Sequence, residues 1–285
     1  MNSLESDDNG VGMKRKKNLY RHSLMSMMRV GGGAPPTPID YCQVGGIYVY
    51  SCVTNGYDLL FPPAIQRRDV KFALFSDLSQ TFGAWRLLPL QIDLACPISS
   101  NRHHKFFPHR LFPNADYSIY IDGNIGIIGD ISALIDEFIA SNAAIGVFRH
   151  RDRKNVLEEV IACIDKGRFD DADMLSYTGQ IKFMLSDGMP DDQPLTDNAI
   201  IFRSHKHEKL TQAMDDWWAQ FNTYTKRDQI SLPYVLWKNN VPTKIWNWSF
   251  RERNEYFEKY PHKGNIFRNI RIRLRNIISK RRFRR

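Results

Sequence analysis

The sequence lacks the features that would place the protein in a membrane or outside the cell. No window approaches about eighteen uninterrupted apolar residues, so we expect no membrane-spanning helix. The N-terminal residues carry charges but no apolar stretch of the kind found in secretory signals, so we expect no signal peptide. Cysteine is scarce, with four residues and no CxxC spacing, and we interpret these as reduced thiols of a cytoplasmic protein.

Three common catalytic motifs are also missing. There is no GxxxxGK[ST] loop, which argues against a P-loop nucleotide hydrolase, and no GxGxxG after the first predicted strand, which argues against a dinucleotide-binding dehydrogenase. GxSxG is absent too, which argues against the usual α/β-hydrolase. The sequence therefore has to be interpreted from its pattern of strands, helices and strand ends.

What is present suits one sizeable domain. The chain has 285 residues, of which 42% are hydrophobic and 25% charged, and its formal net charge is +9. Residues 265–285 contain nine Lys and Arg and no acid, so the remainder of the chain is electrically balanced. The basic character is therefore a property of the C-terminal end and not of the body.

The order of apolar segments predicts an α/β fold. Residues 1–40 are polar and rich in Gly and Pro, and we interpret them as a disordered leader. Short β-branched and aromatic runs follow and predict strands near 45–54, 70–77, 117–124, 143–150 and 198–205. Apolar residues three and four apart predict helices near 131–141, 155–167 and 207–221. Strands that alternate with helices favour a mostly parallel sheet flanked by helices.

Polar side chains end each of these predicted strands. In open α/β sheets the ligand crevice lies outside the carboxyl ends of the strands, so we expect these side chains to collect there. They are Asn55, Asp58, Asp77, Asp122, Arg149, His150, Arg203 and His205. Carboxylates with a divalent metal, together with cationic side chains, are suited to binding a diphosphate and neutralising it as a leaving group.

A set of ordered segments between Tyr41 and Lys238 carries a family resemblance. These segments are YDLL (57–60), HKFFPHRLFPNADYSIYIDGNI (104–125), FRHRDRKNVLEE (148–159), LTDNAIIFRSH (195–205), WW (217–218) and KRDQISLPYVLWK (226–238). Together they resemble the glycosyltransferase-like domain family, a former domain of unknown function that also occurs in plant mucilage proteins. That family is similar to GT-A nucleotide-sugar transferases of the glycogenin and galactosyltransferase type, which implies a single GT-A, Rossmann-like α/β domain.

The resemblance implies a role for several positions. Asp122-Gly123-Asn124 falls where GT-A enzymes carry Asp-x-Asp, and His262 resembles the late histidine that completes a site for Mn²⁺ or Mg²⁺. Asn124 in place of the second Asp is a departure that leaves the metal with fewer anionic ligands, and His205 is the alternative to His262. Lys263 resembles the lysine that reaches the diphosphate.

Further residues are assigned to the nucleotide and to the transferred sugar. The nucleotide side comprises Thr54, Tyr57, Asp58, Asp77, Lys105, His150 and Arg153, and the sugar side comprises Asp197, Asn198, Asp228 and Gln229. Lys105, His109 and Arg110 are placed in a loop before the Asp122 strand.

Simpler interpretations of some of these residues stay open. Asp228 and Gln229 would also suit the first turn of a helix, and Asp197 a turn before a strand. Trp217 and Trp218 are expected to pack in a helix interface, and Glu158 and Glu159 are expected on a helix surface.

The C-terminal segment has an amphipathic pattern. At 100° per residue its apolar residues Ile266, Phe267, Ile270, Leu274, Ile277 and Ile278 share one side, and arginines occupy the other. We interpret it as a basic helix that lies on an anionic membrane. Packing against the domain is the alternative; nucleic-acid binding is not expected, because an apolar stripe has no use on a phosphate backbone.

The sequence thus predicts a leader (1–40), a GT-A-like domain (41–262) and a basic C-terminal helix (263–285). The expected activity is sugar transfer from a nucleoside-diphosphate sugar to a glycan or lipid-linked acceptor. The expected setting is surface polysaccharide synthesis at the cytoplasmic face of the membrane. A sugar nucleotidyltransferase is the close alternative, and a non-enzymatic basic adaptor is the alternative of another class.

Overall fold

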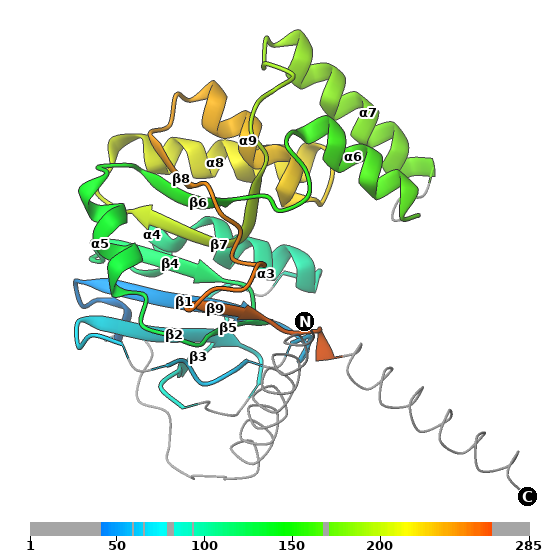
Figure 1. Ribbon diagram of the computed structural model, residues 1–285. Coiled ribbons are helices and arrows are strands. Elements are labelled where there is room, and N and C mark those ends of the chain that lie inside the picture. The colour runs from blue at the N-terminus through cyan, green and yellow to red at the C-terminus, as the bar shows by residue number, and fades with distance from the viewer. Residues whose placement is uncertain are drawn as a thin grey trace, which may run out of the picture.

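The computed structural model describes residues 41–263, except 59, 65, 79–82, 93 and 168–170. The predicted leader, and all but the first residue of the predicted C-terminal helix, lie outside the described residues. The described elements form a layered α/β domain (Figure 1). No described helix combines the length and apolar composition needed to cross a bilayer.

A seven-stranded sheet forms the centre of the domain, in the order β3-β2-β1-β4-β7-β6-β8. Its strands are β1 (Ile47–Val53), β2 (Val70–Ser76), β3 (Arg86–Leu88), β4 (Tyr117–Ile121), β6 (Ile145–Arg149), β7 (Thr196–Ser204) and β8 (Thr243–Trp246). The pairs β1–β2, β1–β4, β2–β3 and β6–β8 are parallel, and β7 runs antiparallel to both β4 and β6. The predicted α/β class with a mostly parallel central sheet is confirmed.

The strands form in apolar runs because both faces of the sheet are covered. On β1, Tyr48, Tyr50 and Cys52 point into one core, and Ile47, Val49 and Val53 point into the other. This alternation is the period of two that separates the faces of a strand. All seven residues of β1 are buried, which is why the run is apolar throughout.

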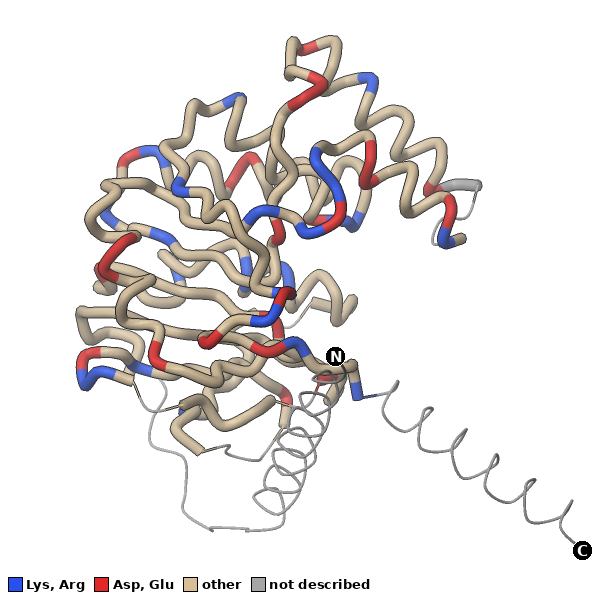
Figure 2. Tube along the Cα trace, in the orientation of Figure 1, with Lys and Arg blue, Asp and Glu red and all other residues tan. Residues whose placement is uncertain are grey.

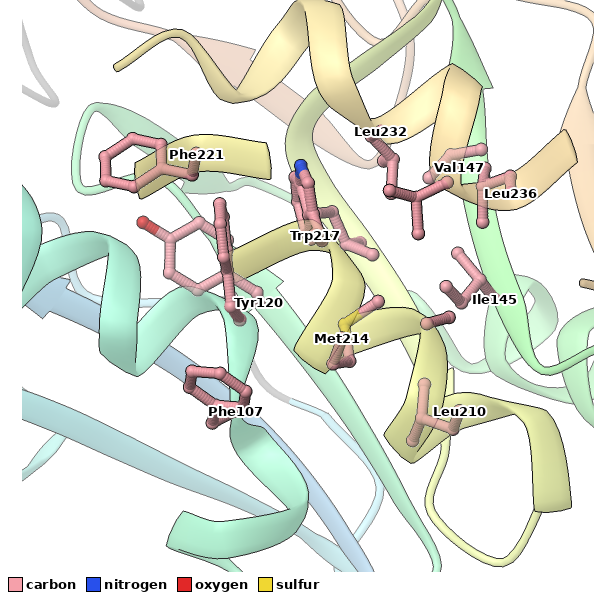
Figure 3. Packing of buried hydrophobic residues seen from close by; sticks show 14 of the residues in the cluster. Phe107, Tyr120, Ile145, Val147, Leu210, Met214, Trp217, Phe221, Leu232 and Leu236 are labelled. Atoms are coloured by element: carbon pink, nitrogen blue, oxygen red, sulfur yellow. The ribbon is translucent and has the colours of Figure 1, made fainter. Parts of the chain in front are cut away.

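Helices cover the first of these faces. They are α3 (Pro97–Phe106), α4 (Pro108–Leu111), α8 (Glu208–Thr223) and α9 (Asp228–Lys238), with α6 (Val156–Asp165) and α7 (Asp171–Ser186) beside them. Figure 3 shows Trp217 and Met214 among the aliphatic and aromatic side chains of this core. Trp217 is fully buried and stacks on Phe106 with ring centroids 3.7 Å apart, so the predicted packing role of this tryptophan is confirmed.

The second face is covered by α5 (Ser132–Ala140) and a small antiparallel sheet of β5 (Ile125–Ile127) and β9 (Phe257–Lys259). A glycine permits the close approach of this sheet, since a Cβ on Gly129 would lie 2.2 Å from the carbonyl oxygen of Glu255. β9 leads directly into Tyr260 and His262. The small sheet therefore brings the end of the described chain back to the Asp122-Gly123-Asn124 turn, where the Tyr260 N–H donates to the Asn124 carbonyl at 2.8 Å.

The direction of β7 corrects one expectation. Arg203 pairs with Ser118 and Ser204 with Tyr117, so Arg203 and His205 lie at the amino end of β4, opposite the carboxyl edge. His205 contacts Ser118 there, and burial lowers the pKa of its imidazole to about 3. His205 is therefore not an alternative metal ligand to His262. Because β7 is antiparallel to β4, it is the first residues of β7, and not its last, that lie at the carboxyl edge.

Candidate active site at the carboxyl edge of the sheet

Asp122 occupies the centre of the carboxyl edge. Its backbone N–H donates to the carbonyl of Ala199 at 2.8 Å, which fixes the end of β4 against β7. The next residue has to be glycine, since a Cβ on Gly123 would lie 2.7 Å from Val53 Cγ2 and 2.9 Å from Asp58 Cβ. The close approach places the Asp58 side chain directly beside the Asp122-Gly123-Asn124 turn.

A lysine from α3 connects Asp122 to α9. Lys105 is 1% exposed, and its Nζ lies 2.6 Å from Asp228 Oδ2 and 3.6 Å from Asp122 Oδ1. Arg102 approaches the other Asp228 oxygen at 3.5 Å. Burial alone would raise the pKa of Asp228, but Arg102 and Lys105 hold it well below its usual value. Lys105 was expected in a loop facing phosphates, whereas the structure places it in a helix between two carboxylates.

Asp122 is the carboxylate of this network that remains accessible. Its side chain is 33% exposed, compared with 11% for Asp228 and 2% for Lys105. A ligand that enters the edge therefore meets Asp122 before either of the other two groups. Lys105 supplies a fixed positive charge behind it.

The loop after β1 and the end of the described chain meet on the nucleotide side. His262 Nδ1 lies 2.6 Å from Asp58 Oδ1, and the Tyr57 ring lies 5.0 Å from the His262 ring. Lys263 Nζ would lie 3.5 Å from a Cβ on Gly56. Tyr57 is 62% exposed and so presents an accessible aromatic face at this point.

Two further predicted residues shape the same loop. Asn55 has a positive φ of 53°, and its N–H donates to Asp77 Oδ2 at 2.7 Å, so Asp77 holds the turn. Thr54 is buried and its hydroxyl donates to the carbonyl of Pro97 at 3.3 Å, which ties the loop to α3. Their direct contact with a nucleotide stays a prediction.

The residues predicted to hold a metal provide an incomplete ligand set. Asn124 is buried and its amide nitrogen donates to the carbonyl of Tyr260 at 3.0 Å, so only its oxygen could act as a ligand. His262 uses Nδ1 toward Asp58, which leaves Nε2. Across the described residues no three His, Cys, Asp or Glu side chains form a group that could hold a metal ion. The protein groups alone do not fit a resident metal, and metal dependence stays a prediction.

The residues predicted to contact the sugar hold the start of β7 against α9. Asn198 Nδ2 donates to the carbonyl of Asp228 at 3.0 Å, and the Gln229 amide donates to the carbonyl of Thr196. Asp197 is fully buried and paired with the guanidinium of Arg251 through both oxygens. Asp228 and Gln229 form the first turn of α9, as the simpler interpretation allowed, and Asp228 belongs at the same time to the Lys105 network.

His150 and Arg153 belong to a separate ionic cluster. Glu159 is fully buried between Arg153 and Arg227, which corrects the expectation that it lies on a helix surface. Burial alone would raise the pKa of Glu159, but the Arg227 guanidinium lowers it. His150 accepts from the N–H groups of Asp152 and Arg153 at 3.1 Å, and burial lowers the pKa of its imidazole.

Of the three basic residues expected in the loop before β4, only Lys105 joins the network of Asp122 and Asp228. Both His109 and Arg110 lie in α4, where Arg110 pairs with Asp215 at 2.5 Å. Sequence reasoning also missed Arg102 and Arg251. Arg102 lies three residues before Lys105, so the helical spacing in α3 could have indicated a shared face, whereas no local signal connects Arg251 to Asp197.

The model of the TOD1/MUCI70 glycosyltransferase-like domain matches residues 67–262. The chain belongs to this family. The glycosyltransferase-like domain predicted from the sequence is thereby confirmed, and it contains the whole edge around Asp122, Lys105 and Asp228. The loop between β1 and residue 67 adds Asp58 from outside the matched range.

Two curated relatives from Arabidopsis thaliana share this region. The probable hexosyltransferase MUCI70 is 28% identical over 187 residues, covering 61% of this chain and 30% of the relative. The alkaline ceramidase TOD1 is 24% identical over 175 residues, covering 57% of this chain and 37% of the relative. The chain thus matches about a third of the length of each.

Solved structures with some likeness include mouse xyloside xylosyltransferase 1 and the bifunctional glycosyltransferase WbbM. The first has a TM-score of 0.43 at 10% identity, covering 71% of this chain and 85% of that chain. The second has a TM-score of 0.45 at 11% identity, covering 70% and 38%. Likeness at this level carries no argument about the chemistry of this chain.

Proposed function

We propose that the protein transfers a hexose from a nucleoside-diphosphate sugar to a glycan or lipid-linked acceptor. The observation that carries the proposal is the accessible Asp122 carboxylate, at the carboxyl end of β4 with the buried Lys105 ammonium 3.6 Å behind it. The family match and the relative named as a probable hexosyltransferase support the same reaction class. A role in surface polysaccharide synthesis at the cytoplasmic membrane face is part of the proposal.

The proposal assigns the donor's parts to neighbouring groups. The base would stack near the exposed Tyr57 ring, which lies beside the loop ordered by Asp77. Lys263 would neutralise charge on the diphosphate, because its ammonium lies over the glycine of that loop. If a divalent ion arrives with the donor, Asp122 is the side chain that would hold it, and the ion would add to the neutralisation of the diphosphate.

The sugar would then lie toward β7 and α9. Asn198 and Gln229 fix the junction of these two elements, and Asp228 presents its carboxylate at the first turn of α9. Asp197 is held by Arg251 and fully buried, so we assign it to positioning and not to proton transfer. The alternative of a basic adaptor predicts that substitution of Asp122 has little effect, whereas the nucleotidyltransferase alternative also depends on Asp122.

The test is calorimetric titration of UDP, GDP and CDP into the protein with and without Mn²⁺, followed by assay of sugar release from the matching donor. Asp122→Asn should weaken binding of the preferred nucleotide by at least about tenfold, which corresponds to roughly 1.4 kcal/mol. Asp191→Asn, an exposed substitution away from the edge, is the matched control. Equal binding by the two variants, or no binding of any nucleotide, would refute the proposal.

The relative named as an alkaline ceramidase favours a second candidate, hydrolysis of a lipid amide. The same preparation should therefore be incubated with ceramide in the absence of any nucleotide. If fatty acid is released and Asp122→Asn does not change its rate of release, the result would favour lipid-amide hydrolysis over sugar transfer. Donor-dependent sugar transfer with no fatty-acid release would remove this candidate.

A further inference from the structure

An apolar groove lies between α6 and α7. Its volume is about 750 Å³, and its lining includes Leu157, Ile161, Ile164, Met174, Ile181 and Leu185. Ile161 is 58% exposed, Ile164 44% and Leu185 40%. Apolar side chains gathered in this way on a surface mark a site that another apolar group covers.

The two helices stand beyond the sheet on the side of the candidate active site. The chain leaves the sheet at the end of β6, forms α6 and α7, and re-enters it at the start of β7. Figure 1 shows that α6 and α7 extend beyond the carboxyl ends of β1 and β4. The groove and the Asp122 edge therefore lie on one side of the molecule.

The helices that form the groove are acidic. α6 and α7 contain the acids Glu158, Glu159, Asp165 and Asp173, none of which lines the groove, and the cation Lys182, which does. Glu159 is already paired with Arg153 and Arg227, and the other acids give the pair a net negative charge (Figure 2). A partner that covers the groove should accordingly be apolar on one side and basic on the other.

Residues 265–285 of the same chain have this composition. They hold nine Lys and Arg and no acid, and the apolar residues Ile266, Ile270, Leu274 and Ile277 recur at helical spacing. We propose that this C-terminal segment docks its apolar stripe in the α6–α7 groove of its own chain, with its cations toward the acidic residues of the two helices. The proposal is independent of the reaction that the edge catalyses.

The segment starts near enough to reach the groove. The described chain ends at Lys263, whose ammonium lies by Gly56 just after β1. Three inter-strand spacings separate β1 from β6, or about 15 Å at roughly 4.8 Å each. Residues 264–269 would span up to about 20 Å if extended, so Ile270, Leu274 and Ile277 can reach α6 while Ile266 belongs to the connecting stretch.

Thiol accessibility in the full chain tests this docking. Ile161→Cys places a reactive thiol in the groove, in a Cys96→Ser background because Cys96 is the exposed cysteine among the four. Its rate of maleimide labelling is compared between the natural C-terminal segment and a segment carrying Ile270→Ser, Leu274→Ser and Ile277→Ser. The triple substitution removes the stripe and keeps all nine cations, and Val44→Cys, 50% exposed before β1, is the control thiol.

The natural segment should slow labelling of Ile161→Cys by about tenfold or more, with the control thiol unchanged, and high salt should reduce the protection. Equal rates with both segments would overturn the proposal. Protection that increases with protein concentration would assign the groove to a second copy and also overturn it. Protection that requires added anionic phospholipid vesicles would assign it to a membrane, with the same consequence.

Discussion

At the scale of single residues, Lys105 is the group whose removal should have the largest consequence. It is buried between Asp122 and Asp228, and its Nζ lies 5.0 Å from the centroid of the Tyr120 ring. Lys105→Met would keep most of the side-chain volume but leave Asp228 buried with a weaker partner, Arg102. We expect the free energy of unfolding to fall by about 3–5 kcal/mol, the usual cost of breaking a buried ion pair.

Urea denaturation of Lys105→Met and of Lys166→Met measures this effect. Lys166 is exposed at the end of α6, so its substitution should change the free energy of unfolding by less than about 0.5 kcal/mol. A loss below about 1 kcal/mol for Lys105→Met would show that Arg102 alone satisfies Asp228. In that case Lys105 would be available to a ligand.

The His262–Asp58 contact gives a pH dependence with a defined sign. The hydrogen bond to Asp58 raises the pKa of His262 above its usual value of about 6.5. The protonated pair therefore stabilises the fold fully below about pH 6.5 and loses that contribution as pH rises through the raised pKa. The contribution should stay under about 1 kcal/mol, because the His262 side chain is 39% exposed.

Proton NMR titration of the His262 ring in wild type and in Asp58→Asn checks this expectation directly. The wild-type midpoint should lie above about 6.5, and the variant midpoint should fall below the wild-type value. A titration that is identical in the two proteins would show that the contact does not persist in solution.

At the scale of elements, the small β5–β9 sheet positions the end of the site, because it precedes Tyr260 and His262. Gly129→Ala would place a Cβ 2.2 Å from the Glu255 carbonyl, a backbone atom that cannot rotate away. We expect a loss of about 1–3 kcal/mol in the free energy of unfolding, together with weaker nucleotide binding. Gly179→Ala is the control, since its Cβ meets nothing within 4 Å and helix α7 should gain up to about 1 kcal/mol.

Thermal unfolding of these two alanine variants measures the stability of the fold, and nucleotide titration measures whether the small sheet positions the site. If Gly129→Ala binds nucleotide as wild type does, the small sheet has no part in forming the site. If both variants unfold at the wild-type temperature, the close approach at Gly129 relaxes without cost.

The element scale also shows how far the sequence could predict this molecule. Apolar runs located β1, β2, β4, β6 and β7, and the alternation with helices predicted the sheet, since burial on both faces leaves a local signature. The direction of β7 left no such signature, because an apolar run has the same pattern in either orientation. That one reversal moved Arg203 and His205 away from the site.

The site itself was predictable only where a residue ends a strand. Asp122 met this condition, whereas the pairing of Lys105 with Asp228 and of Arg251 with Asp197 joins residues far apart in sequence. Similarly, no neighbour in the sequence distinguishes the buried Glu159 from the half-buried Glu158, and the difference becomes clear only when Arg227 lies beside Glu159 in space.

At the scale of the whole molecule, buried histidines should make the fold sensitive to acid. Burial lowers the pKa of His103 and of His109 to about 4 and that of His205 to about 3. The unfolded chain binds more protons than the folded chain between these values and about 6.5, so stability should fall as pH drops through this window. At about 1.4 kcal/mol for each pKa unit the three histidines set an upper bound of roughly 9 kcal/mol between pH 7 and pH 4, and because each is only half-buried we expect about half of that or less.

Denaturant unfolding at several pH values measures this loss, and His205→Gln should reduce its slope because one lowered histidine is removed. Gln can still donate to Ser118 Oγ, which His205 contacts at 2.8 Å. A free energy of unfolding that is flat from pH 7 to pH 4 would show that these imidazoles become hydrated without unfolding of the chain.

The connection between β6 and β7 has a consequence for how the protein could be re-engineered. Phe148 pairs with Asp197 and Arg149 with Thr196, so residues 150–195 leave and re-enter the sheet through adjacent positions of one ladder. This segment could therefore be replaced by another sequence, because the two sheet positions at which it begins and ends would stay paired. A replacement that retains Glu159 would keep its ion pair with Arg227, the residue that precedes α9, and so would keep α9 in position. Such a replacement would change α6 and α7 and leave Asp122, Lys105 and Asp228 in place, since none of these three lies between residues 150 and 195.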